Sequence, residues 1–135
     1  MSNSFELEIV TPRRTQYRGP VQSVSCPGAQ GRFQVLQSHA PFLSTLAVGM
    51  VKVIDADGTE SRYAISGGIA QVFHNQMRIL ADSAERADQI DVDRAERARQ
   101  RAEERLAARS AEIDADRAQA ALLRAVNRLK IARGE

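Results

Sequence analysis

The sequence predicts two domains in series, an all-β sandwich over residues 1–83 followed by an all-α antiparallel helical hairpin over residues 84–135. Two patterns predict this division. Up to Asp82, apolar and polar residues alternate with a period of two, in short runs that Gly and Pro interrupt, as in a sandwich or barrel of short strands. After Asp82 the β-branched residues become rare, and Ala, Glu and Arg predominate with a helical period. We therefore place the domain boundary between residues 83 and 84.

The composition bounds the class of protein. Of 135 residues, 43% are hydrophobic and 27% are charged, as in a soluble globular protein, and no long uncharged apolar run could span a bilayer. The first residues show no secretion signal. The single cysteine, Cys26, excludes an internal disulfide and fits a reducing compartment, and we expect it to be a plain strand residue.

Alternating runs of apolar and polar residues predict the strands of the first domain. In chain order these runs cover residues 5–9, 21–26, 32–36, 50–54, 62–66, 69–73 and 77–81. Residues 55–58 and 74–76 are the predicted hairpin turns. Pro41 interrupts the pattern because it cannot donate to a strand ladder, and Gly67 with Gly68 predicts a sharp bend.

An internal repeat organises the second domain. Residues 90–95 (IDVDRA) recur as residues 113–118 (IDADRA), which indicates two copies of one helix start, with Asp91 and Asp114 as the N-caps. Apolar residues then recur at helical spacing and predict a narrow, Ala-rich seam between two antiparallel helices. The predicted seam residues are Val92, Ala95, Ala98, Ala102 and Leu106 in the first helix, and Ala118, Leu122, Ala125, Leu129 and Ala132 in the second. A seam of this kind buries little surface, so the hairpin should be marginal alone and able to occupy more than one position.

Nothing in the sequence favours catalysis or metal binding. His39 and His74 are far apart in the chain and lack metal-ligand spacing; we expect His74 in a solvated turn and His39 in a loop that it shapes or through which it contacts a partner. Gly67 and Gly68 are not followed by a phosphate-binding Lys. No carboxylate pair or nucleophile triad emerges either.

Four arginines form the one group of residues in the sequence whose spacing indicates a binding site. Arg94 and Arg101 share a face of the first helix, Arg124 and Arg128 share a face of the second, and the hairpin brings the two pairs level beside the seam. Their charge requires anions. Ion pairs with acidic residues such as Glu85 or Glu104 are one solution, and a bound polyphosphate is the other, because the guanidinium fork suits phosphate oxygens.

The basic residues of the hairpin also raise the alternative of a helical nucleic-acid-binding module. Acidic residues are interleaved with most of the basic ones, which argues for a salt-bridged, solvated surface. No aromatic residue follows Phe73, so the hairpin has no platform on which bases could stack. We therefore do not expect nucleic acid as a partner.

Short segments spread over the whole chain resemble one family. These segments are Ser38-His39-Ala40-Pro41-Phe42-Leu43, Ile65-Ser66-Gly67-Gly68-Ile69, Ile79-Leu80-Ala81-Asp82 and Asp91-Val92-Asp93-Arg94-Ala95. In this order, on a β-then-helical layout, the chain resembles the epsilon subunit of F-type ATP synthases. That family has an N-terminal β-sandwich and a C-terminal helical hairpin, in agreement with the two domains predicted above.

The resemblance implies a rotor part of a proton-translocating ATP synthase rather than an enzyme, with no required cofactor. In the family the sandwich binds the gamma subunit and the ring of c subunits, and couples rotation to ATP synthesis. The hairpin lies folded on the sandwich or extends toward the alpha and beta subunits and blocks ATP hydrolysis. The subunit is then a peripheral membrane protein on the cytoplasmic face of the energy-coupling membrane.

The resemblance also implies a regulatory ATP site. Some bacterial members bind ATP on the folded hairpin through an Ile/Leu-Asp-x-x-Arg-Ala motif, which this chain matches. The residues at matching positions are Ile90, Asp91, Arg94 and Ala95 of the motif, together with Glu85, Arg101, Arg124 and Arg128.

Three further positions are implied as partner contacts, namely Arg32, Ser38 and His39. Two of them depart from the family pattern. Ser38 stands where Gly is usual, which affects loop geometry, and Arg32 stands where an acidic residue is common in the loop facing the c-ring, which changes the charge of that contact.

Overall fold

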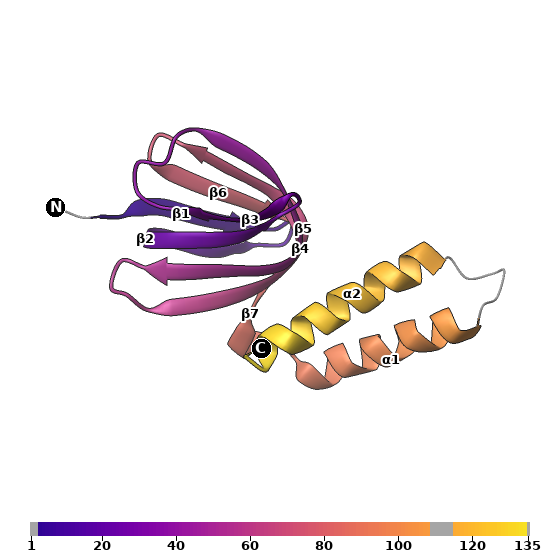
Figure 1. Cartoon of the computed structure of the whole chain (residues 1–135). Helices are drawn as coiled ribbons and strands as arrows, with labels where there is room; N and C mark the ends of the chain where they lie inside the picture. The colour runs from indigo at the N-terminus through magenta and orange to yellow at the C-terminus, as the bar shows by residue number, and fades with distance from the viewer. Residues whose placement is uncertain (1–2, 109–114, 135) are drawn as a thin grey trace. The chain divides into compact units, whose positions relative to one another are not determined.

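The computed structural model describes residues 3–108 and 115–134. It divides into two compact units, unit 1 (Met1–Arg86) and unit 2 (Ala87–Glu135) (Figure 1). The predicted order of an all-β domain followed by a two-helix domain is confirmed.

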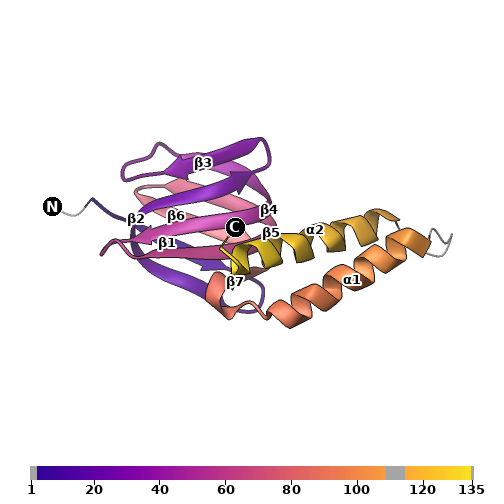
Figure 2. The same cartoon turned by 60° about the horizontal axis from the view of Figure 1, so that its bottom comes forward.

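Unit 1 is a seven-stranded antiparallel sheet with one parallel pairing. Its strands are β1 (Phe5–Val10), β2 (Thr15–Gly28), β3 (Gly31–Val35), β4 (Phe42–Asp55), β5 (Glu60–Phe73), β6 (Gln76–Ala81) and β7 (Ala84–Arg86). The strand order is β1-β6-β5-β4-β2-β3, and β1 also pairs with β2, so the sheet closes on itself (Figure 2). The parallel pair is β1 with β6, and the short β7 pairs with β5. Closure leaves a single core inside the sheet and removes most free strand edges.

Period-two alternation positions the core of unit 1, as predicted. In β6 every second residue is buried, and β1 buries Phe5, Leu7 and Ile9. Each large side chain that is fully buried contributes roughly 1.5–3 kcal/mol to stability. The largest fully buried side chains are Leu7, Ile9, Val21, Val24, Cys26, Val35, Val51, Val53, Ile65, Met77 and Ile79.

The strands are longer than the sequence predicts. The runs at residues 62–66 and 69–73 form one strand, β5, which passes through Gly67 and Gly68 at φ values of +118° and +146°. The prediction of two separate strands is therefore wrong: the chain continues through the two glycines as one strand, and both halves are paired. At Gly68 a Cβ atom would collide with the backbone oxygen of Leu80 and lie 2.8 Å from the Cα of Ala81.

Among the strand segments that the sequence did not predict, two pair with β5. β4 begins at Phe42, directly after Pro41. The sequence predicted a strand only from residue 50, but the first half of β4 already pairs with β5. Residues 84–86 form β7, within the range that the sequence assigned to the hairpin domain. Both pairings are between segments distant in sequence, which alternation alone does not reveal.

Unit 2 contains a short 3-10 helix, η1 (Ala87–Gln89), and two α-helices, α1 (Val92–Ala108) and α2 (Ala115–Ala132). The helices lie side by side and antiparallel (Figures 1 and 2). The N-cap predicted at Asp91 is present, since its Oδ1 accepts a hydrogen bond from the backbone N–H of Arg94 at 3.0 Å. The second predicted cap, Asp114, and the turn between the helices lie outside the described residues.

The Ala-rich seam is confirmed with one correction. The predicted seam residues that are buried are Ala95 and Ala102 on α1 and Ala118, Ala125 and Leu129 on α2; α2 also buries Ile131, which was not predicted. Val92 is 38% exposed and is not part of the seam, because it is the first residue of α1. Within the described residues, neither α1 nor α2 has the length and apolar content needed to cross a membrane.

Candidate functional site

The four predicted arginines lie on one side of the helical hairpin. Each residue of an α-helix is rotated by about 100° around the helix axis from the one before it. This rotation places Arg94 and Arg101 roughly 90–110° from the α1 seam. It places Arg124 and Arg128 roughly 80–120° from the α2 seam, in the same rotational sense. Because α1 and α2 run antiparallel, the same sense on each helix leads to the same side of the pair. We call this the arginine side of the hairpin.

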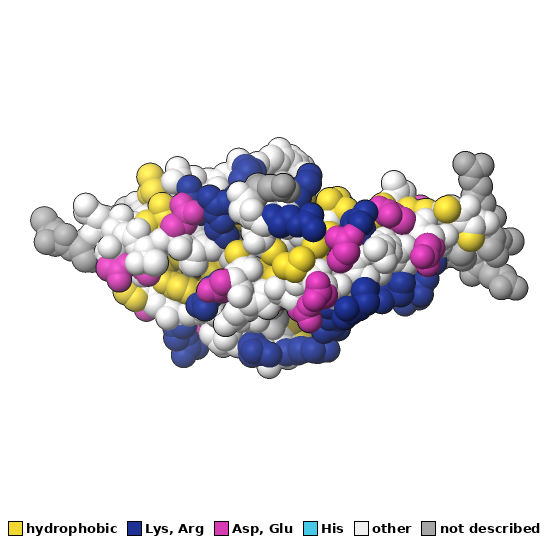
Figure 3. Space-filling model, turned by 90° about the horizontal axis from the view of Figure 1, so that it is seen from below, with side chains coloured by type: hydrophobic (Ala, Val, Ile, Leu, Met, Phe, Trp, Pro, Cys, Tyr) yellow, Lys and Arg dark blue, Asp and Glu magenta, His cyan; other side chains and the backbone are white. Residues whose placement is uncertain are grey.

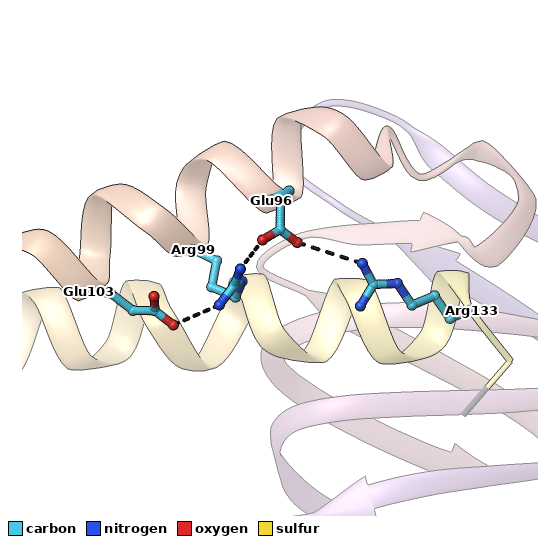
Figure 4. A network of polar contacts seen from close by, with 4 residues as sticks. All are labelled: Glu96, Arg99, Glu103 and Arg133. Carbon is cyan, nitrogen blue, oxygen red and sulfur yellow. Dashed lines mark hydrogen bonds and ion pairs between the residues drawn. The ribbon is translucent and has the colours of Figure 1, made fainter.

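The opposite side of the hairpin carries a network of paired charges (Figure 4). Arg99 contacts Glu96 and also Glu103, with 2.8 Å between Arg99 Nη1 and Glu103 Oε1. Arg133 reaches across from the end of α2, and its Nη2 lies 3.6 Å from Glu96 Oε2. This ion pair links the two helices. Glu96 and Arg133 are both rotated from their seams in the sense opposite to the four arginines, so their contact confirms independently that the same rotational sense leads to the same side of the hairpin. The network was not predicted, although Glu96 and Glu103 lie three and four residues from Arg99, a spacing that favours ion pairs on a helix.

Three of the four arginines on the arginine side lack such pairing. Glu104, one of the acidic partners considered from the sequence, falls on the outward side of α1 by the same helical count. Among the described residues, no ion pair links Arg94, Arg101 or Arg124 to an acidic side chain. These three arginines are exposed, and Arg128 is half-buried. The arginine side therefore presents guanidinium groups that can bind an anion.

The Ile-Asp-x-x-Arg-Ala residues have different roles in the structure. Ile90 is buried, Ala95 packs in the seam with no exposed surface, and Asp91 caps α1. Arg94 presents its guanidinium group on the arginine side. Glu85 lies in unit 1 on β7, opposite Ala64 of β5. Ile90, Asp91 and Ala95 thus form the start of the hairpin and hold Arg94 at the start of α1.

Of the predicted partner-contact residues, Ser38 and His39 lie in the connection between β3 and β4, whereas Arg32 lies at the start of β3, next to the turn from β2. Arg32 is exposed on β3, and its Nη2 donates to Ser25 Oγ at 3.0 Å. Ser38 has a φ of +61°, and its backbone N–H donates to Asn75 Oδ1 at 2.9 Å. The His39 ring packs edge-on against Phe42 with 5.7 Å between centroids. The positive φ explains why Gly fits the position of Ser38.

Sequence reasoning missed an exposed apolar surface on unit 1. Ile69 of β5 and Leu80 of β6 are directly opposite each other and are 44% and 45% exposed. Val10 of β1 is opposite Leu80 and extends the same row, and we call these three residues the apolar row. The signal in the sequence is that Leu80 directly follows Ile79, so both faces of β6 carry apolar side chains there.

These features define a class of small two-unit protein, in which a closed β unit carries an exposed apolar row and a helical hairpin carries a row of arginines along one side. Two family models match the chain. The ATP synthase delta/epsilon chain beta-sandwich domain covers residues 4–87, and the ATP synthase delta/epsilon chain long alpha-helix domain covers residues 88–133.

Curated relatives agree with the family models. The chain is 49% identical over 107 residues to an ATP synthase epsilon chain of Nitratidesulfovibrio vulgaris, covering 79% of each protein. It is 42% identical to an ATP synthase epsilon chain of Syntrophomonas wolfei over 79% of this chain and 78% of that one. The chain belongs to the ATP synthase delta/epsilon chain family and is a non-catalytic subunit of the epsilon type.

A solved structure shows the same fold. A chain in the Euglena gracilis mitochondrial ATP synthase (OSCP/F1/c-ring) matches with a TM-score of 0.78 and 21% identity, covering 100% of this chain and 84% of that one.

Proposed function

We propose that this chain is a central-stalk, rotor subunit of a proton-translocating F-type ATP synthase on the cytoplasmic face of the energy-coupling membrane. In this proposal unit 1 binds the gamma subunit and the c-ring, and unit 2 inhibits ATP hydrolysis and binds regulatory ATP. The observation that carries the proposal is the match of both family models, in order, over nearly the whole chain. The similar solved structures belong to assemblies described with a c-ring and, in one case, a central stalk.

The apolar row supports the gamma contact. A pair of directly opposed, half-exposed aliphatic residues on a closed sheet costs solubility unless a partner covers it. Substituting Ile69 and Leu80 together by Ser should weaken capture of purified gamma subunit by at least about tenfold, since each buried aliphatic side chain contributes roughly 1.5–3 kcal/mol. Leu123→Ser on α2 is the matched control, because Leu123 is 57% exposed. Failure of the unmodified chain to bind gamma would remove the subunit proposal.

The small seam supports a hairpin that changes position. Its buried residues on α1 are only alanines, so the two helices gain little free energy from packing together. A folded and an extended hairpin can then differ by a few kcal/mol, which a ligand or partner could offset. A distance label between unit 1 and Arg133, read while ATP is added, should show a shorter mean distance with ATP. A distance that does not respond to ATP contradicts the coupling of the ligand to hairpin position.

The arginine side supports the ATP site. A phosphate bound by Arg94 would gain charge-assisted hydrogen bonds, each worth about 1.5–3 kcal/mol, so Arg94→Ala should weaken ATP binding by about 10- to 150-fold in calorimetry. Arg97→Ala is the matched control, because Arg97 is exposed on the outward side of α1. Bound ATP favours the folded hairpin by mass action. No heat on adding ATP with or without Mg²⁺ would remove this part and leave the subunit assignment unchanged.

A further inference from the structure

The connection between β3 and β4, residues 36–41, contains no buried residue. A loop without a buried side chain gains little stability from packing, so its conformation depends on hydrogen bonds. Ser38 lies within this loop and has a φ of +61°, which is unfavourable for a residue with a side chain. The loop therefore relies on contacts with other segments of unit 1.

Asn75, in the turn between β5 and β6, provides such a contact. Its side-chain Oδ1 accepts a hydrogen bond from the backbone N–H of Ser38 at 2.9 Å. Its Nδ2 donates to the backbone oxygen of Ser4 at 3.1 Å, and its backbone oxygen accepts from the N–H of Glu6 at 3.3 Å. One turn residue thus links the loop and the start of the chain, through side-chain bonds to residues 37 and 71 positions away.

The turn itself does not require asparagine. His74 and Asn75 have φ values of +47° and +57°, the left-handed conformation of a two-residue hairpin turn. Asparagine adopts this conformation more readily than most residues with a side chain, but glycine adopts it more readily still. What asparagine adds is an amide with both a donor and an acceptor. The structure uses this amide to hold the loop.

The segment that Asn75 holds leads into an exposed apolar surface. Leu36 is 52% exposed, and Phe42 and Leu43 at the start of β4 are 38% and 67% exposed. The ring of His39 contacts the ring of Phe42 with 5.7 Å between the centroids. We call Leu36, His39, Phe42 and Leu43 the loop surface.

The loop surface continues the apolar row. Leu43 is opposite Gln71 and Thr45 is opposite Ile69, so Leu43 and Ile69 lie diagonally on the same face of the sheet. Long side chains in this arrangement are within reach of one another. A partner that covers the apolar row therefore meets the loop surface as well.

We propose that Asn75 is a positioning residue for partner binding, which fixes residues 36–41 so that the loop surface contacts the same gamma subunit as the apolar row. The inference rests on the proposed gamma contact and extends it to a second group of residues. A loop that Asn75 orders in advance loses less conformational freedom when the partner binds, and the difference appears as affinity.

This contact depends on apolar groups rather than on charge. Basic side chains gather along one edge of the helical hairpin (Figure 3). Residues 36–43, in contrast, include no Asp, Glu, Lys or Arg. The effect of Asn75 on affinity should therefore be equal at low and high salt, because ionic screening acts on charged groups.

The test measures binding of purified gamma subunit to the full-length chain by calorimetry. The test variant, Asn75→Gly, keeps the φ of the turn and removes both side-chain hydrogen bonds. Asn75→Asp is the rescue variant, because it keeps an acceptor for the N–H of Ser38 and loses the donor to Ser4. The matched control is Asp57→Gly, which removes two side-chain hydrogen bonds with Thr59 from the β4–β5 turn and leaves residues 36–41 unchanged.

We expect Asn75→Gly to weaken gamma binding by about 3- to 10-fold, which corresponds to losing one hydrogen bond that orders the loop. Asn75→Asp and Asp57→Gly should each change the affinity by less than about twofold. In hydrogen exchange, amides of residues 36–41 should exchange faster in Asn75→Gly and not in Asp57→Gly. Denaturant unfolding of each variant separates a loss of affinity from a loss of stability.

Three results would overturn the inference. The first is unchanged gamma affinity in Asn75→Gly, which would place the loop outside the interface. The second is an equal loss of affinity in Asp57→Gly, which would make the effect one of stability alone. The third is an equal loss in Asn75→Asp, which would assign the effect to the Ser4 contact. Failure of the unmodified chain to bind gamma is a separate outcome, which would remove the proposed gamma contact and this inference with it.

Discussion

The substitution Ala102→Leu tests whether the hairpin opens independently of the β unit. Ala102 is 3% exposed and lies in the seam, where its methyl group faces α2. Leucine adds three carbon atoms where the helices approach closely, and overpacking of this kind costs about 1–3 kcal/mol. That cost shifts the equilibrium between closed and open hairpin by about 5- to 150-fold.

The ion pair across the helices cannot offset this cost. Glu96 and Arg133 are 3.6 Å apart, and their side chains are 28% and 53% exposed, so solvent screens the pair. Exposed pairs contribute about 0.2–1 kcal/mol. Packing in the seam therefore contributes more to closure than the ion pair does, and the substitution should open the hairpin even though the network of Figure 4 stays intact.

Hydrogen exchange read by mass spectrometry measures the effect. In the Ala102→Leu variant, amides of α1 and α2 should exchange about 5- to 150-fold faster, while amides of β1 and β6 keep their rates. Ala107→Leu is the matched control, because Ala107 is exposed on α1 and the same change of residue type leaves helix propensity almost unchanged. Unchanged protection of the helices, or equal loss in the β strands, would refute the reasoning.

Three further predictions concern unit 1. Gly68→Ala should destabilise unit 1 by more than about 3 kcal/mol in denaturant unfolding. Gly68 has a φ of +146°, and the new Cβ would collide with the backbone oxygen of Leu80. A loss of stability below about 1 kcal/mol would contradict this close approach. Burial raises the pKa of the Cys26 thiol from 9.0 to about 12, and Arg32 has a smaller effect in the opposite direction. As the pH rises, the thiolate therefore forms first in the unfolded chain. The stability of unit 1 should fall as the pH rises from about 9 toward 12. A Cys26→Ala variant with the same alkaline loss would disprove that origin. Ser38→Gly should stabilise unit 1 by up to about 1 kcal/mol, since Ser38 has a φ of +61°, and a lower melting temperature would be the contrary result.

Local sequence pattern determined much of the site. Helical spacing alone placed Arg94 with Arg101 and Arg124 with Arg128, because the helical period sets which residues share a face. The N-cap at Asp91 was likewise predictable, since a cap depends only on the residues of one helix turn. The alternation of Phe5, Leu7 and Ile9 predicted which side of β1 is buried for the same reason.

Tertiary structure decided what these faces meet. The pairing of β1 with both β2 and β6, and of Ile69 with Leu80, joins residues far apart in sequence, so alternation could not reveal the closed sheet or its apolar row. Likewise, only the antiparallel packing of α1 on α2 separates the paired charges around Glu96 from the arginine side. The physical reason is that backbone periodicity is a property of each segment, whereas the identity of its neighbours depends on how segments bury their apolar faces together.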